Sequence, residues 1–242
     1  GQYQTGQISE EELHAIENVA CPGPGACGGQ FTANTMATIS QIIGICPMGM
    51  ADVPAEDDAK LEVAQQAGEL MIQLVKNDIR PSKIITKTAL ENAIAAAAAT
   101  GGSTNAVLHT LAFAREAGID FTIDEIEAIS RRTPIITDLR PTGKYVALDL
   151  YKAGGVALVA KRMLEGGYLD GSTLTVTGKT LAEAVATAQE TPGQQVVRSL
   201  DNPIKASGGL VILKGNLAPR GAVVKLKGDE PQHHRGPARV FD

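Results

Sequence analysis

The sequence contains no tryptophan, and its four phenylalanines and four tyrosines bring the aromatic fraction of the 242 residues to only 3%. Few aromatic rings leave few platforms on which nucleic-acid bases could stack. Basic residues are not in excess either, because 22 lysines and arginines stand against 27 aspartates and glutamates, for a net charge of −5. Nucleic-acid binding needs a concentration of positive charge. We therefore expect no nucleic-acid partner.

Long hydrophobic runs are also missing. The longest candidate, residues 93–99, is short, rich in alanine and followed by Thr-Gly-Gly, whereas a membrane-spanning helix takes about 20 apolar residues. A hydrophobic content of 43% and a charged content of 20% are typical of a soluble globular chain. We expect an aliphatic core and no membrane partner.

Cysteine is scarce, with three residues in a chain that carries no secretory signal. An odd number of thiols argues against a disulfide framework and favours a reducing compartment. We therefore expect a cytoplasmic protein, or an organellar one if the source is eukaryotic. The chain starts on Gly1 and still shows a strand-like pattern at its last residues, which is typical of an internal piece of a longer protein.

Apolar periodicity predicts helices in the first part of the chain. Ser9 with Glu12, and Thr122 with Glu125, have the spacing of capping boxes, which start helices. Gly118 is a helix stop signal. The expected helices cover residues 9–20, 32–43, 57–76, 86–100, 106–117 and 122–132.

The pattern changes after residue 132. Segments 134–139 and 173–177 are predicted strands, each paired with a helical stretch at 156–164 and 181–188, and this alternation indicates an α/β layer. Beyond Asn202-Pro203, strands are expected at 209–213 and 221–226 without a helix between them. We therefore predict one domain over residues 1–203 and the start of a β-rich domain over 204–242.

Cys27 is the first candidate for chemistry. It lies among glycines just ahead of a predicted helix, whose free amides and positive dipole end stabilise a thiolate. A thiolate is what a metal or an iron–sulfur cluster needs, and glycines leave room for a bulky ligand. The alternative is a small thiol packed in a tight loop.

A second candidate is the segment Gly102-Ser103-Thr104-Asn105. It places hydroxyl groups and free amides at the start of a helix, an arrangement suited to a carboxylate or phosphate oxygen. The alternative is an ordinary N-cap, since serine and threonine are favoured caps in general. Two weaker patterns, a G-x-G-x-x-G match at Gly23, Gly25 and Gly28 and the Gly178-Lys-Thr180 tripeptide, lack the context of a nucleotide site.

Residues 20–36, ACPGPGACGGQFTANTM, closely resemble the signature of the dihydroxy-acid dehydratase family. Related sugar-acid and phosphogluconate dehydratases carry different residues around the cluster cysteine, so this segment favours the dihydroxy-acid branch. The resemblance covers nearly the whole chain. It continues through residues 101–109 (GGSTNAVLH), 138–145 (DLRPTGKY), 174–180 (LTVTGKT), 201–204 (DNPI) and 213–219 (LKGNLAP).

The resemblance implies a hydro-lyase that converts 2,3-dihydroxy carboxylic acids, such as 2,3-dihydroxyisovalerate, to 2-keto acids in isoleucine and valine biosynthesis. It implies an iron–sulfur cluster held by three cysteines, the third aligned with Cys27, and it favours a 2Fe–2S over a 4Fe–4S cluster. Cys21 is not a ligand in that scheme. Ser103, Thr104 and Asn105 are candidates for shaping the substrate or cluster pocket.

Other implied parts lie outside this segment. They are the two remaining cluster cysteines, the magnesium ligands, a modified lysine and the serine base, so no catalytic residue is assigned here and the isolated segment is expected to be inactive. The resemblance further implies a homodimer. Its fold is a three-layer α/β/α domain with a mostly parallel sheet, followed by the start of a β-barrel-like domain.

Two departures bear on specificity. Gln30 replaces the methionine commonly found there, and residues 46–54, CPMGMADVP, differ from the usual serine-rich continuation. Substrate preference therefore has a rival within the family, a sugar-acid (aldonate) dehydratase. The alternative outside it is a noncatalytic α/β module that holds an anion at the Ser103 helix start while Cys27 is merely packed.

Overall fold

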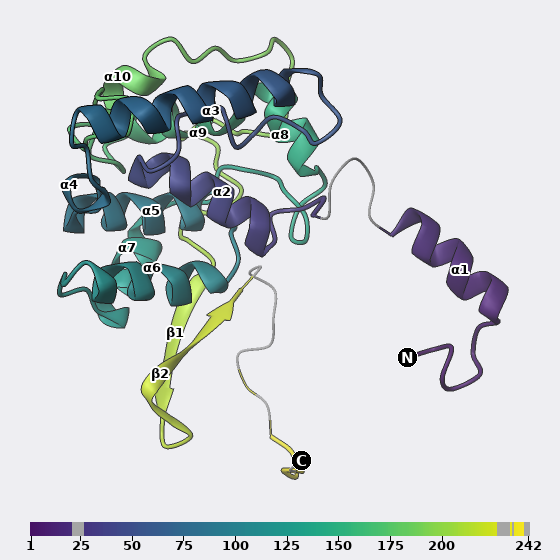
Figure 1. Cartoon of the computed structure of the whole chain (residues 1–242). Coiled ribbons are helices and arrows are strands. Elements are labelled where there is room, and N and C mark those ends of the chain that lie inside the picture. The colour runs from purple at the N-terminus through teal and green to yellow at the C-terminus, as the bar shows by residue number, and fades with distance from the viewer. Residues whose placement is uncertain (21–26, 227–232, 234, 240–242) are drawn as a thin grey trace.

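The computed structural model describes residues 1–20, 27–226, 233 and 235–239. They form an α/β chain in which helices dominate (Figure 1). The helices are α1 (Glu10–Val19), α2 (Thr32–Ile43), α3 (Ala59–Lys76), α4 (Pro81–Ile84), α5 (Lys87–Ala99), α6 (Asn105–Glu116), α7 (Ile123–Arg132), α8 (Ala147–Ala153), α9 (Gly155–Glu165) and α10 (Leu181–Val185), and the strands are β1 (Leu210–Gly215) and β2 (Ala218–Lys225).

Helix α5 forms the centre of the core. Most of its residues are fully buried alanines, whose small side chains let neighbouring helices approach closely. It contacts α2, α6, α7 and α9. In Figure 1, α2 and α5 lie in the middle of the helical body, with α9 above them and α6 and α7 below. This packing holds the start of α2 and the start of α6 close together.

The predicted helices are confirmed, including their start signals. Ser9 with Glu12 and Thr122 with Glu125 form reciprocal capping boxes, and Gly118 takes a φ of 67° just after α6. The expected helix at 181–188 ends three residues early, at Val185. Sequence periodicity missed the short helices α4 and α8.

The predicted strands at 134–139 and 173–177 do not pair into a parallel sheet within the described residues, where they make only isolated bridges. Their backbone amides bond elsewhere: Ile136 donates to the carbonyl of Ala99 at the end of α5, and Val176 donates to that of Gly44 after α2. Carbonyls at helix ends accept these hydrogen bonds, so the amides are satisfied without a neighbouring strand.

Strands β1 and β2 form an antiparallel hairpin, in agreement with the two strands expected after residue 203. Leu210 pairs with Lys225 and Leu213 with Ala222, and a register shift follows Leu213. The hairpin projects from the base of the helical body in Figure 1, and β1 contacts α7. The described part of this region is a two-stranded sheet.

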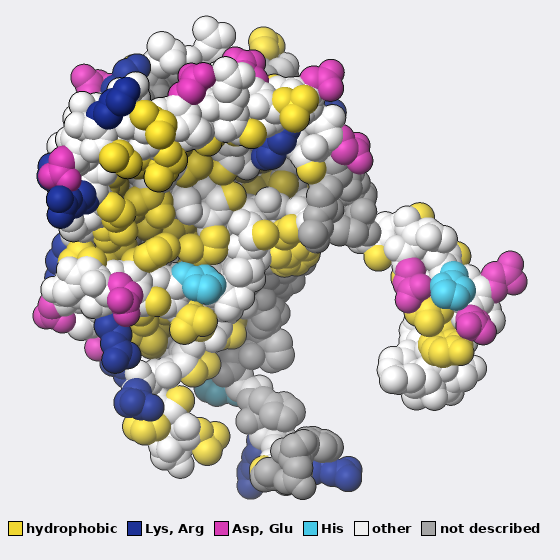
Figure 2. Space-filling view, viewed as in Figure 1, with side chains coloured by type: hydrophobic (Ala, Val, Ile, Leu, Met, Phe, Trp, Pro, Cys, Tyr) yellow, Lys and Arg dark blue, Asp and Glu magenta, His cyan; other side chains and the backbone are white. Residues whose placement is uncertain are grey.

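Two helices bury no residue at all. α1 stands apart from the body (Figure 1), and α3 lies across the top of the body with several large apolar side chains exposed. Figure 2 shows hydrophobic side chains gathered on the viewed face of the body, beneath its upper edge. The apolar side chains exposed on α3 are Leu61, Met71, Ile72 and Val75.

No helix among the described residues is both long enough and apolar enough to cross a lipid bilayer.

Candidate functional site

Cys27 precedes α2 by five residues, at a helix start that no side chain caps. The N-cap residue, Phe31, provides no side-chain acceptor for the free amides of the first turn. The half-buried thiol of Cys27 donates a hydrogen bond to the carbonyl of Gly29 over 3.4 Å. The Asn34 amide donates to the carbonyls of Cys27 (2.6 Å) and Gly29 (2.7 Å). Asn34 thus fixes the cysteine loop to the first turn of α2.

Cys27 lines a cavity of about 240 Å³, which we call the Cys27 hollow. Lys60 also lines it and donates to the carbonyl of Val53 over 2.9 Å. The hollow therefore combines one thiol, one ammonium group and the carboxylate of Asp52 within an otherwise largely apolar wall. The remaining lining residues are Ala33, Asn34, Ala51, Val53, Pro54, Ala55, Ala147 and Leu148.

Asp52 joins three parts of the chain behind this hollow. Its carboxylate accepts hydrogen bonds from the Gln41 side chain on α2 and from the backbone amide of Val156 in the first turn of α9, each over 2.8 Å. Gly155 leaves room for this contact, since a Cβ there would lie 2.6 Å from the carboxylate, and its φ is 68°. Burial raises the pKa of Asp52 above its usual value.

Ser103 and Asn105 meet the start of α2, the helix that follows Cys27. The Ser103 amide donates to the hydroxyl of Thr35 over 3.0 Å, and the Asn105 side chain donates to the hydroxyl of Thr32 over 2.6 Å. Gly102 permits this approach, because a Cβ there would lie 2.9 Å from Thr35 Cγ2. These hydrogen bonds therefore join the segment at the start of α6 to the first turn of α2.

Thr104 is the N-cap residue of α6, but its side chain makes no capping hydrogen bond. Neither Thr104 nor its neighbours Ser103 and Asn105 are among the described residues that line the Cys27 hollow. The structure thus brings the segment to the helix that Cys27 precedes without placing it in the wall of that hollow.

Gln30 is turned into the core, with 1% of its surface exposed. Its side-chain amide donates to the hydroxyl of Thr100 over 3.1 Å, and its backbone amide donates to the carbonyl of Arg140 over 2.7 Å. The departure at this position therefore affects packing beneath the cysteine loop. Sequence reasoning missed Asp52 and Lys60 as members of the site, although Asp52 lies in the second segment that departs from the family pattern.

The other two cysteines differ in their position. Cys21 and the first part of the glycine-rich loop lie outside the described residues. Cys46 is half-buried, its thiol contacts the carbonyl of Pro47 at 3.6 Å, and burial raises its pKa. Among the described residues no three histidine, cysteine or acidic side chains gather into a metal site. Of the two described cysteines, Cys27 is the one that lines the Cys27 hollow.

Two family models match the chain. The model described as dihydroxy-acid/6-phosphogluconate dehydratase N-terminal matches residues 1–184, and the corresponding C-terminal model matches residues 195–242.

Curated relatives align with the whole chain. Dihydroxy-acid dehydratases from Roseiflexus sp. (strain RS-1), Koribacter versatilis and Thermus thermophilus are 58%, 54% and 54% identical to it. The alignments cover 100% of this chain but 43%, 42% and 44% of those proteins. The chain therefore spans less than half the length of these relatives.

Proposed function

Because the chain belongs to the dihydroxy-acid/6-phosphogluconate dehydratase family, we propose that it is part of an enzyme that dehydrates 2,3-dihydroxy carboxylic acids to 2-keto acids. Such an enzyme is a hydro-lyase of isoleucine and valine biosynthesis. The observation that carries the proposal is Cys27, a half-buried thiol at an uncapped helix start, on the wall of a hollow large enough for an inorganic cluster.

The residues around Cys27 fit a cluster ligand. The first-turn amides of α2, which no side chain caps, and the positive end of the helix dipole follow Cys27 closely in the chain. Asn34 fixes the cysteine backbone, and the Lys60 ammonium group adds a positive charge to the same hollow. When bound through Cys27, an iron–sulfur cluster would supply a Lewis acid to polarise the leaving C3 hydroxyl of the substrate.

In this proposal Cys27 would provide one ligand, and the other cluster ligands would come from outside the described residues, since no three histidine, cysteine or acidic side chains gather within them. We further infer a 2Fe–2S cluster rather than a 4Fe–4S cluster, Mg²⁺ bound by residues outside this segment, a cytoplasmic homodimer and an inactive isolated segment. The complete enzyme would contain the three-layer domain with its parallel sheet and a β-barrel-like domain. The boundary proposed near residue 203 is supported by the hairpin that starts at Leu210.

The test uses the full-length enzyme, reconstituted with iron and sulfide under anaerobic conditions. Cys27→Ser is expected to lose the brown visible absorption of the cluster together with dehydratase activity. Cys46→Ser is the matched control, because the Cys46 thiol does not line the Cys27 hollow, and it should keep both. An unchanged spectrum in Cys27→Ser contradicts the ligand assignment.

A sugar-acid dehydratase is the second candidate, since the matching family models cover 6-phosphogluconate dehydratases as well. The two are separated by comparing turnover of 2,3-dihydroxyisovalerate with turnover of an aldonate by the same enzyme. Preference for the aldonate would overturn the first assignment and leave the cluster site intact. The noncatalytic anion site at Ser103 finds less support, because the Ser103 amide already donates to Thr35.

A further inference from the structure

Helix α5 ends in a Schellman motif built on two glycines. Gly101 takes a φ of 56°, and its amide donates to the carbonyl of Ala98 over 3.2 Å. The amide of Gly102 donates to the carbonyl of Ala97 over 2.7 Å. The carbonyl of Gly101 itself lies at the negative end of the helix dipole, where a cationic donor is stabilising.

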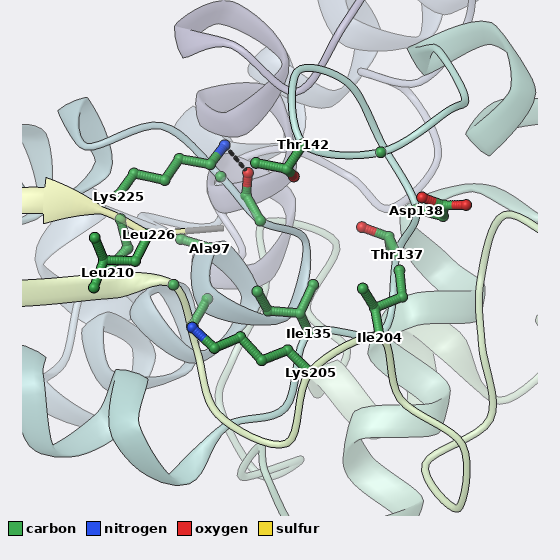
Figure 3. A pocket seen from close by; sticks show the side chains of 15 residues that line it. Ala97, Ile135, Thr137, Asp138, Thr142, Ile204, Lys205, Leu210, Lys225 and Leu226 are labelled. Atoms are coloured by element: carbon green, nitrogen blue, oxygen red, sulfur yellow. Dashed lines mark hydrogen bonds between the residues drawn. The ribbon is translucent and has the colours of Figure 1, made fainter. Parts of the chain in front are cut away.

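Lys225, the last residue of β2, provides that donor. Its ammonium group donates a hydrogen bond to the carbonyl of Gly101, drawn as the dashed line in Figure 3. Lys225 lines a mostly apolar hollow of about 150 Å³ between the hairpin and the end of α5, and it takes part in no ion pair within the described residues. Burial lowers the pKa of Lys225. Because a hydrogen bond away from water is stronger than an exposed one, this contact fastens the hairpin to the helix end.

Two further contacts lead from this helix end to the cysteine loop and the helix that follows it. The side-chain amide of Gln30 donates to the hydroxyl of Thr100 over 3.1 Å. The backbone amide of Ser103 donates to the hydroxyl of Thr35, in the first turn of α2, over 3.0 Å. Thr100 and Ser103 lie within two residues of the carbonyl that the hairpin holds. A shift of that carbonyl therefore disturbs both contacts.

The hairpin and the cysteine belong to different parts of the family pattern. Lys225 lies in the region that the C-terminal family model matches, whereas Gly101 and Cys27 lie in the N-terminal one. We propose that Lys225 is a positioning residue for the Cys27 site. It holds residues 101–105 against the first turn of α2, to which Asn34 joins the cysteine loop. This inference rests on the function proposed for Cys27.

The first test is hydrogen exchange on the full-length enzyme. Lys225→Met keeps the apolar stem and removes the donor, so residues 101–105 and the first turn of α2 should exchange about tenfold faster. Lys225→Arg keeps a cationic donor and should return the rate to within about threefold of the wild type.

Two controls separate a local effect from a general loss of stability. Lys214→Met changes the same hairpin, where Lys214 pairs with Asp124 of α7, and it should leave exchange at residues 101–105 unchanged. Helix α9, which packs against α8 and α10, should keep its exchange rates in Lys225→Met. Equal acceleration in α9, or the same acceleration in Lys214→Met, overturns the proposal.

The second test observes the cluster in the anaerobically reconstituted full-length enzyme. Lys225→Met should alter the visible circular dichroism of the cluster and lower kcat about tenfold, with a smaller change in KM. Lys225→Arg should restore the wild-type spectrum, and Lys214→Met should not change it. Faster exchange at residues 101–105 with an unchanged cluster spectrum means that Lys225 only stabilises a helix end, and this result overturns the proposal.

Two other variants keep the outcome decisive. If Lys225→Met fails to fold, Thr35→Val takes its place, because it removes the acceptor of the Ser103 amide and leaves the hairpin contact in place. An unchanged cluster spectrum in Thr35→Val then overturns the proposal. Cys27→Ser tests the underlying function separately. If it keeps the chromophore, the ligand assignment fails, whereas loss of the chromophore there with an unaltered spectrum in Lys225→Met refutes the positioning role alone.

Discussion

The carboxylate of Glu125 gathers several donors at the start of α7. Lys87 forms an ion pair with it at 2.5 Å, and the backbone amide and hydroxyl of Thr122 donate to it over 2.7 and 2.9 Å. The hydrogen bond from Lys87, followed by those from Thr122, lowers the pKa of Glu125 from 4.5 to about 2. A depressed pKa means that this stability is present above about pH 4.5 and is lost as the pH falls toward 2.

Glu125→Gln is therefore expected to lose less stability than the wild type between pH 5 and pH 3. Urea denaturation midpoints at the two pH values measure the difference. Gln keeps an acceptor for the capping amide but carries no charge to titrate. If the two proteins lose stability equally over this interval, the ion pair and capping hydrogen bonds of Glu125 do not act as described.

The pKa of Asp52 is shifted in the opposite direction to that of Glu125, because burial raises it in the folded chain. Its contribution to stability is largest below the unfolded pKa and declines as the pH rises through the folded value. Asp52→Ala would leave the Val156 amide and the Gln41 side chain without their acceptor. We expect a loss of about 2 kcal/mol in the free energy of unfolding. Asp52→Asn keeps one acceptor oxygen and should lose less, and equal losses in the two variants would contradict the two-donor arrangement.

At the level of elements, a substitution on α5 should destabilise the chain much more than a substitution on α3. Ala96 on α5 is fully buried among packed helices, so Ala96→Leu forces neighbours apart and should destabilise the chain by about 1–3 kcal/mol. Val75 on α3 is 75% exposed, so Val75→Gln should change stability by no more than about 0.5 kcal/mol. Urea unfolding of both variants measures the contrast, and a large loss in Val75→Gln would contradict the exposed position of α3.

Local signals made the helices predictable, whereas the hydrogen-bond partners of the extended segments could not be predicted. The capping box of Ser9 with Glu12 depends on residues three positions apart, so the sequence contains all of it. The segment 134–139 is apolar and extended, yet its amides bond to the end of α5 and to other loops, and no local pattern identifies such partners. An apolar run alone therefore suggested a sheet strand where the described chain has none.

The candidate site divides in the same way. Cys27 and the start of α2 are adjacent in sequence, so the glycine-rich motif identified the thiol directly. Asp52 reaches its place through contact with Val156, which lies 104 positions further along the chain. Lys60 lines the same hollow from the first turn of α3, a helix that buries none of its residues. Contacts of this kind depend on the folded arrangement of distant segments.

For the molecule as a whole, packing among the described residues does not explain why the large apolar side chains of α3 are exposed. This 18-residue helix buries none of its side chains, and Leu61 is 82% exposed. Met71, Ile72 and Val75 are exposed together near the end of the same helix, and a group of exposed apolar side chains marks an interaction site in soluble proteins. The curated relatives are more than twice as long as this chain, which spans 43% of the Roseiflexus protein. We therefore expect other parts of the full-length enzyme to cover α3.

Hydrogen exchange measured on both proteins tests this expectation. Amides of α3 should exchange more slowly in the full-length enzyme than in the 242-residue chain, because a covered helix opens less often than one held by its own hydrogen bonds. Amides of α5 provide the internal control, since that helix is already buried in the chain alone and its protection should change little. Equal exchange of α3 in the two proteins would mean that its apolar face stays open to solvent in the full-length enzyme.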